Sequence, residues 1–127
     1  MCIEFIKNST PVVEYFGKWP SFHDAEITKI EINREGILLK ILFYLFIMSK
    51  NIDSRGHYVL EKKSYIEMQF SGIEELKLFD FNVQNVIAGL IIKSAAGGKK
   101  YIEIEPCYGL YGSFMCRDIE VMRIVKT

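Results

Sequence analysis

The residues best suited to chemistry gather in one short stretch, Trp-Pro-Ser-Phe-His-Asp-Ala-Glu-Ile at residues 19–27. This stretch holds one of the two histidines, the only tryptophan and two carboxylates. An imidazole beside carboxylates can serve acid–base catalysis or ligate a metal ion. Aromatic rings beside charges are equally typical of a protein-binding surface. The stretch therefore has a catalytic, a metal-binding and a recognition interpretation.

An enzyme or a metalloprotein would need partners for His23 and Asp24 elsewhere in the chain. His57 is the only other imidazole, and the three cysteines are scattered and lack the short spacings of zinc ligands. The sequence contains neither a Gly-x-Ser-x-Gly nucleophile motif nor a Walker phosphate loop. A small hydrolase or metal-dependent enzyme using His23, Asp24 and Glu26 stays open as an alternative, and we expect no metal and no cofactor.

The same stretch also has a purely structural interpretation. Trp19 and Phe22 would cover an open end of a sheet. Asp24 would accept backbone N–H groups in a turn, and His23 would donate a hydrogen bond.

Composition limits the classes of partner. A chain of 127 residues, half apolar and a quarter charged, has the composition of one globular domain over residues 1–127. The 16 basic and 16 acidic residues balance, so no cationic excess favours nucleic acid. The odd number of cysteines fits a reducing cytoplasm, although Cys107 and Cys116 could face each other across a hairpin.

The apolar run at residues 37–48 predicts a strand and no membrane span. It includes Lys40 and is well short of the ~20 residues that a spanning helix needs. The N-terminus lacks the basic and apolar regions of a signal peptide, so we expect no membrane partner. Because the run is apolar on both faces, we expect a second layer on one face and a helix or partner on the other. A second copy in that position would give a homodimeric structural or adaptor module.

The surrounding elements are predicted to be mainly strands. Thr10 as N-cap and Pro11 at the first helical position predict a short helix that Gly17 ends. Alternation from Glu26 predicts a strand, in which Ile27 breaks the pattern and indicates a bulge. A hairpin turn at residues 33–36, a polar loop at 49–56, further strands at 58–70, 76–81, 101–105 and 119–125, and a helix at 83–90 follow.

Pro106 is expected to end the strand before it, and glycines near residue 110 predict a last hairpin. The predicted fold is mainly β, or α+β at the margin, with seven or eight antiparallel strands and one or two short helices. An antiparallel sandwich or a partly open barrel fits this pattern.

The stretch at residues 19–27, followed by its hairpin, resembles the immunity protein 50 family of bacterial polymorphic toxin systems. Residues 78–87 and 105–114 are also similar to that family. The resemblance implies a small, non-enzymatic, cytoplasmic protein that protects its producer by binding a cognate toxin. The motif residues of the family fall on Trp19, His23, Asp24 and Glu26.

Toxin binding would need a rigid scaffold with exposed aromatic or charged anchors. The candidate toxin-binding or motif residues are Trp19, Phe22, His23, Asp24, Glu26, Tyr108 and Tyr111. The two tyrosines would otherwise pack across the strands of their hairpin. A motif shared by proteins that meet different toxins is better suited to architecture than to specificity. We therefore expect the variable contacts on the exposed sheet face, the hairpin at residues 108–111 and the loop residues Lys50, Asp53, Arg55 and His57. The predicted function is direct, stoichiometric and non-catalytic neutralisation of a toxin.

Overall fold

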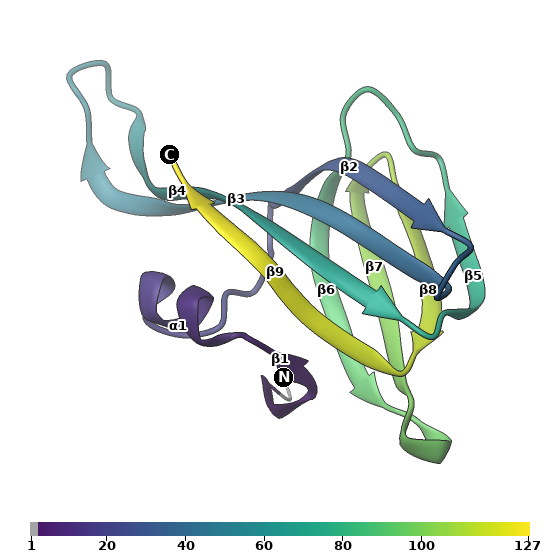
Figure 1. Ribbon diagram of the computed structural model, residues 1–127. Coiled ribbons are helices and arrows are strands. Elements are labelled where there is room, and N and C mark those ends of the chain that lie inside the picture. The colour runs from purple at the N-terminus through teal and green to yellow at the C-terminus, as the bar shows by residue number, and fades with distance from the viewer. Residues whose placement is uncertain (1–2) are drawn as a thin grey trace.

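The computed structural model describes residues 3–127, apart from the side chains at positions 49, 50 and 58, and consists mainly of strands (Figure 1). The elements are a 3-10 helix (Ile3–Phe5), β1 (Ile6–Lys7), α1 (Thr10–Phe16), β2 (Glu26–Asn33), β3 (Leu38–Ile52), β4 (Tyr58–Ser71), β5 (Glu74–Phe79), β6 (Val86–Ser94), a second 3-10 helix (Ala96–Gly98), β7 (Lys100–Tyr108), β8 (Tyr111–Cys116) and β9 (Asp118–Lys126). The prediction of a mainly β fold is confirmed.

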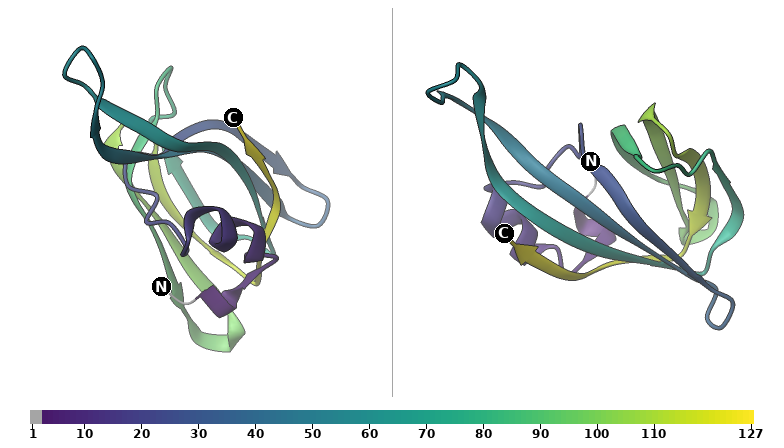
Figure 2. Two further views of the ribbon diagram at one scale, coloured as in Figure 1. Left: turned by 90° about the vertical axis from the view of Figure 1, so that its left-hand side faces the viewer. Right: turned by 90° about the horizontal axis from the view of Figure 1, so that it is seen from above.

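The described strands form one nine-stranded sheet in the order β1-β9-β4-β3-β2-β6-β7-β8-β5. Neighbours are antiparallel except for β1 and β9, which run parallel. Because β2 and β6 share only the pair Glu26 and Val86, the sheet folds over at this point. Figure 2 shows the two resulting layers, β9-β4-β3-β2 and β6-β7-β8-β5.

The space between the layers holds one cluster of buried apolar side chains. Alternate residues of β3 and β4 supply much of it, as the period of two predicted: Leu39, Ile41, Phe43, Leu45, Ile66, Met68 and Phe70. The ring of Phe70 packs edge to face on Phe114 of β8, with centroids 5.1 Å apart. This contact joins one layer to the other.

The start of α1 and the helix predicted at residues 83–90 differ from the structure. Ser9, not Thr10, holds the N-cap position of α1, although Gly17 ends the helix with a φ of 83° as expected. Residues 86–90 of the predicted helix belong to β6, and residues 83–85 lie in the loop before it. A register shift between Ile87 and Gly89 changes the phase of the alternation there, which gives the apolar residues a helix-like spacing.

Pro106 does not end its strand, because β7 continues to Tyr108. The proline pairs with Ile87 beside the same irregularity, where a missing N–H is tolerated. The bulge predicted near Ile27 is confirmed by a register shift between Ile27 and Lys29.

Half of the predicted loop at residues 49–56 is strand, because β3 continues to Ile52. β3 and β4 continue as a hairpin that projects beyond the rest of the sheet (Figure 1), and we call residues 47–60 the arm. At its tip the Asp53 carboxylate accepts the N–H groups of Arg55 and His57, at 2.9 and 3.0 Å. The arm exposes Ile47, Met48, Ile52, Val59 and Leu60.

The second layer covers one face of β3 as predicted, and within residues 3–127 no helix covers the other; a partner on that face stays a prediction. The core covers one face, but the opposite face carries Leu42, Tyr44 and Phe46, which are only half-buried. Within residues 3–127 no second layer lies over this face (Figure 2). We call it the outer face.

The terminal strand β5 has an irregular edge. The register against β8 shifts between Glu74 and Lys77, and Glu75 adopts a φ of 53°. Glu74 forms an ion pair with Lys99 at 2.6 Å. Bulges and charged side chains are the usual means by which natural sheets protect an edge strand.

The first prediction concerns Gly112, where β8 and β5 approach most closely. A Cβ atom at this position would overlap the carbonyl oxygen of Lys77. We expect Gly112→Ala to lower the free energy of unfolding by about 2–3 kcal/mol, because the backbones must move apart. The control Gly97→Ala, at a φ of 72° but in open space, should cost only about 1 kcal/mol. Urea denaturation measures both, and equal losses would contradict the prediction.

Candidate functional site

Residues 24–27 form the corner at which the two layers join. The Asp24 N–H donates to the Ile87 carbonyl (3.0 Å), and the Ile87 N–H donates to the Ala25 carbonyl (2.9 Å). The Ile27 N–H donates to the Asn85 carbonyl at 2.8 Å. We call these bonds, together with the Glu26–Val86 pair, the seam.

The loop that leads into the seam is held by aromatic packing. Phe22 and Asp24 adopt φ values of 64° and 66°, a left-handed conformation that side chains other than glycine rarely take. Phe22 is nonetheless fully buried, with its ring edge to face on Phe43 at 5.0 Å. The indole of Trp19 lies 5.5 Å from the Phe22 ring. Burial of these rings offsets the backbone strain, and the two residues close this end of the core.

The side chains of His23 and Asp24 lie outside the core. The Nδ1 atom of His23 is 3.0 Å from the Ala88 carbonyl oxygen, and its Nε2 atom is 3.7 Å from the Asp24 carboxylate. Both side chains are about half exposed or more, at 67% and 47%, so this contact contributes little to stability. The described contact of Asp24 with β6 is through its backbone, not through the carboxylate turn that the sequence suggested.

His57 does not join the candidate group of His23, Asp24 and Glu26. Glu26 pairs with Tyr44, whereas His57 lies at the tip of the arm. Ile52 follows Tyr44 by eight positions in β3, which corresponds to about 26 Å along the strand. Within the described part of the chain, no three His, Cys, Asp or Glu side chains are placed to hold a metal ion.

The cysteines do not form the bond that the sequence allowed. Cys107 is an exposed free thiol and Cys116 a buried one. Cys116 pairs with Lys100 at the other end of the hairpin from Cys107, which explains why the two cannot meet. Burial raises the pKa of the Cys116 thiol to about 12. Elsewhere, a hydrogen bond from Lys99 lowers the pKa of Glu74.

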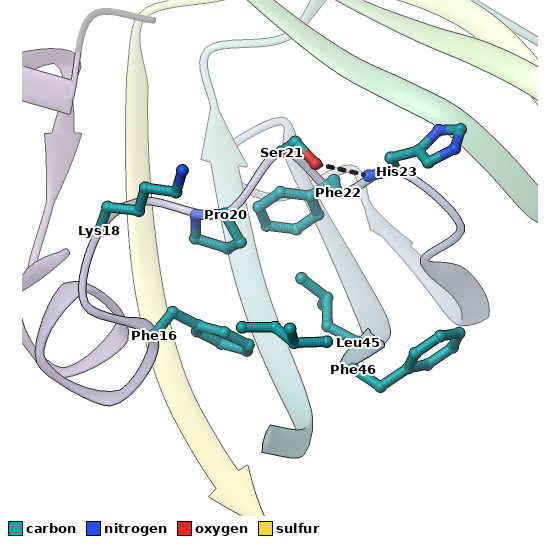
Figure 3. A pocket seen from close by; sticks show the side chains of 9 residues that line it. Phe16, Lys18, Pro20, Ser21, Phe22, His23, Leu45 and Phe46 are labelled. Atoms are coloured by element: carbon teal, nitrogen blue, oxygen red, sulfur yellow. Dashed lines mark hydrogen bonds between the residues drawn. The ribbon is translucent and has the colours of Figure 1, made fainter. Parts of the chain in front are cut away.

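A pocket of about 240 Å³ opens beside the seam (Figure 3). It exists because β2 begins opposite Tyr44, which leaves the edge of β3 beyond that residue free. Phe16, Phe22 and Leu45 supply apolar walls, and Lys18, Pro20, Ser21, His23, Phe46 and Ile47 complete the lining. In Figure 3 the imidazole of His23 lies at the rim and turns away from the Phe22 ring. The lining is therefore mainly apolar, with Lys18, Ser21 and His23 as its polar members.

Asn85 connects the seam to the hairpin at residues 108–111, and the sequence did not single it out. Its side chain is 2% exposed. The amide oxygen accepts the N–H groups of Asn82 (2.8 Å) and Leu110 (3.0 Å), while the amide nitrogen donates to the Asn82 carbonyl (2.8 Å). The Asn-x-x-Asn spacing of Asn82 and Asn85 was a signal in the sequence, because it allows the two residues to bond to each other within one loop.

Tyr108 and Tyr111 lie next to the seam and remain accessible, at 55% and 39% exposed. Tyr108 pairs with Val86, and the ring of Tyr111 stacks on Phe79 at 5.2 Å. The fold thus brings residues 19–27 together with the two tyrosines, while Asp53, Arg55 and His57 lie apart on the arm. The side chain of Lys50 lies outside the described residues.

A family model described as Immunity protein 50 matches residues 8–126. The chain belongs to the immunity protein 50 family. Membership implies that the protein neutralises a toxin. No curated protein and no solved structure matches the chain. No helix among the described residues is long and apolar enough to cross a membrane.

The three segments that resemble the immunity protein 50 family meet at one place. Residues 24–27 bond to residues 85–87 across the seam, and the side chain of Asn85 bonds to Leu110. Leu78 pairs with Gly112 in the neighbouring strands. The resemblance therefore follows the join between the layers of this immunity protein.

The second prediction tests the buried amide of Asn85. Asn85→Ala leaves the N–H groups of Asn82 and Leu110 without their acceptor, so we expect a loss of about 2–4 kcal/mol in unfolding free energy. The control is Asn33→Ala, which removes one acceptor for the Glu35 N–H in an exposed turn and should cost below about 1 kcal/mol. Urea denaturation compares them, and a loss at Asn85 no larger than at Asn33 would argue against a structural clamp.

The third prediction concerns the thiols. In the native protein iodoacetamide should modify Cys107 rapidly and leave Cys116 unmodified, because Cys116 is buried and its pKa is about 12. Peptide mapping by mass spectrometry reads each cysteine separately. The control is the same reaction in about 6 M urea, a concentration that unfolds most small proteins. Under these conditions both thiols should react. Native modification of Cys116 at the rate of Cys107 would refute the assignment.

Proposed function

We propose that this immunity protein neutralises its toxin by binding it directly in a one-to-one complex, without catalysis, in the cytoplasm of the cell that produces it. The observation that carries the proposal is the family match over residues 8–126. The exposed free thiol of Cys107 accords with a reducing compartment.

Two features of the site support binding over catalysis. The ionisable side chains of the motif, His23 and Asp24, point to solvent and not into an enclosed cavity. The sheet also leaves several large apolar side chains exposed to solvent. Exposed apolar side chains that lie together are typical of a protein-binding surface. On β2 and the arm, those at least half exposed are Ile32, Met48 and Ile52.

The fourth prediction is made in two steps. The tagged chain is first used to capture proteins from its own cells, and a captured protein that arrests growth when expressed alone is taken forward. Co-expression of the immunity protein should restore growth, and light scattering should show a one-to-one complex. Toxin recovered from that complex under denaturing conditions should have an unchanged intact mass and regain its toxicity after refolding.

The control is the triple variant His23→Ala/Asp24→Asn/Glu26→Gln, which removes the ionisable side chains of the motif. Asparagine is chosen for position 24 because it tolerates the left-handed backbone conformation found there. The triple variant should still protect cells. Protection by a tenth of an equivalent of immunity protein, or a permanent change in the mass of the toxin, would show turnover and so refute stoichiometric binding.

A further inference from the structure

The outer face is a continuous apolar surface that crosses three strands. Tyr44 of β3 pairs with Tyr65 of β4, with ring centroids 5.0 Å apart, and Tyr65 pairs with Val125 of β9. Leu42 lines a shallow depression together with Tyr65, Arg123 and Val125. Aromatic residues and arginine are the types enriched at the centres of protein interfaces.

The outer face continues onto the arm and to the pocket. Phe46 follows Tyr44 on the same side of β3, with ring centroids 6.2 Å apart, and also lines the pocket near His23 (Figure 3). Met48, 55% exposed, pairs with Leu60 at the base of the arm. One partner surface can therefore contact the face, the arm and the pocket together.

Two ion pairs lie within the outer face. Arg123 lies 3.5 Å from the Glu67 carboxylate, and Lys40 lies 3.8 Å from that of Glu31. Within each pair the two charges offset one another, so the surface that complements the centre of the face is mainly apolar and carries no excess of charge. This pattern disfavours a strongly charged toxin surface as the occupant.

The size of the surface fits one protein partner. At the usual strand spacing and rise, β2, β3, β4, β9 and the arm present a projected area on the order of 600 Å². Side chains roughen this surface, so its accessible area is larger than its projection. A standard interface buries about 800 Å² on each partner, and the face with its arm supplies an area of this order.

We infer that the toxin docks on the outer face and the arm through an apolar, uncharged surface of its own. The inference rests on the proposed function and adds the location and the chemistry of contact. The competing surface, Tyr108 and Tyr111, lies on the hairpin that Asn85 fixes, and the ring of Tyr111 is already stacked on Phe79 of β5. The arm beside the outer face instead leaves Met48 and Ile52 exposed.

The test measures the affinity of purified immunity protein variants for the toxic protein obtained in the capture experiment. Tyr44→Lys should weaken binding at least 100-fold, and Met48→Lys at least 10-fold, because each places a cation within an apolar contact. Met48 is exposed, so its variant keeps the test valid should Tyr44→Lys fail to fold. The matched control Tyr108→Lys, also at an exposed tyrosine, should bind within threefold of the wild type. Raising NaCl from about 50 to 500 mM, which screens long-range charge, should change the dissociation constant less than threefold.

The outcomes separate the two hypotheses. Binding of both face variants at wild-type strength, a 100-fold loss in Tyr108→Lys, or a steep salt dependence would overturn the docking inference and leave toxin binding intact. A wild-type chain that binds and neutralises no toxic protein would instead remove the proposed function. Sedimentation provides one more arm, since a homodimer that Tyr44→Lys dissociates would assign the outer face to a second copy.

Discussion

The whole arrangement depends on how few bonds join β2 to β6. One strand pair, Glu26 with Val86, and three backbone hydrogen bonds around it connect the two halves of the sheet. Because so few bonds form this join, each side needs further contacts to hold it in place. Phe22, which is buried in the core despite its left-handed φ, stabilises the first side. The buried amide of Asn85 stabilises the second side. A buried amide that bonds through both its oxygen and its nitrogen is costly to disturb, and it stabilises the join on this side.

This join also explains why one apolar face of β3 and β4, the outer face, is not covered by the rest of the described chain. Since the sheet folds at the seam, β3 and β4 turn one face to the core and present the other outward. Architecture and recognition can then occupy different places. The three segments that resemble the family meet at the corner, whereas the side chains of the outer face make none of the hydrogen bonds across the seam.

Sequence reasoning predicted the period-two strands well because each has one buried face. The inward set at Ile66, Met68 and Phe70 is an example. It was wrong where a bulge shifts the phase, as in β6, because a bulged strand imitates helical spacing. For the site, the local density of residues 19–27 was visible, but the clamp at Asn85 depends on Leu110, 25 positions away. For the second face of β3 the sequence left a helix or a partner open, since hydrophobicity records that a face avoids water and not what covers it.

The irregular edge of β5 has a consequence for the behaviour of this protein at high concentration. Under the proposed function, an immunity protein must accumulate before the toxin arrives, while its apolar face stands open. A sheet with a flat edge would add further copies strand by strand and grow into fibres. The turned backbone at Glu75 and the Glu74–Lys99 pair interrupt one end of the sheet, and at the other end β1 offers only two residues. Addition of strands at the β5 edge is thereby restrained, whereas a contact made through a face produces a discrete complex that does not propagate.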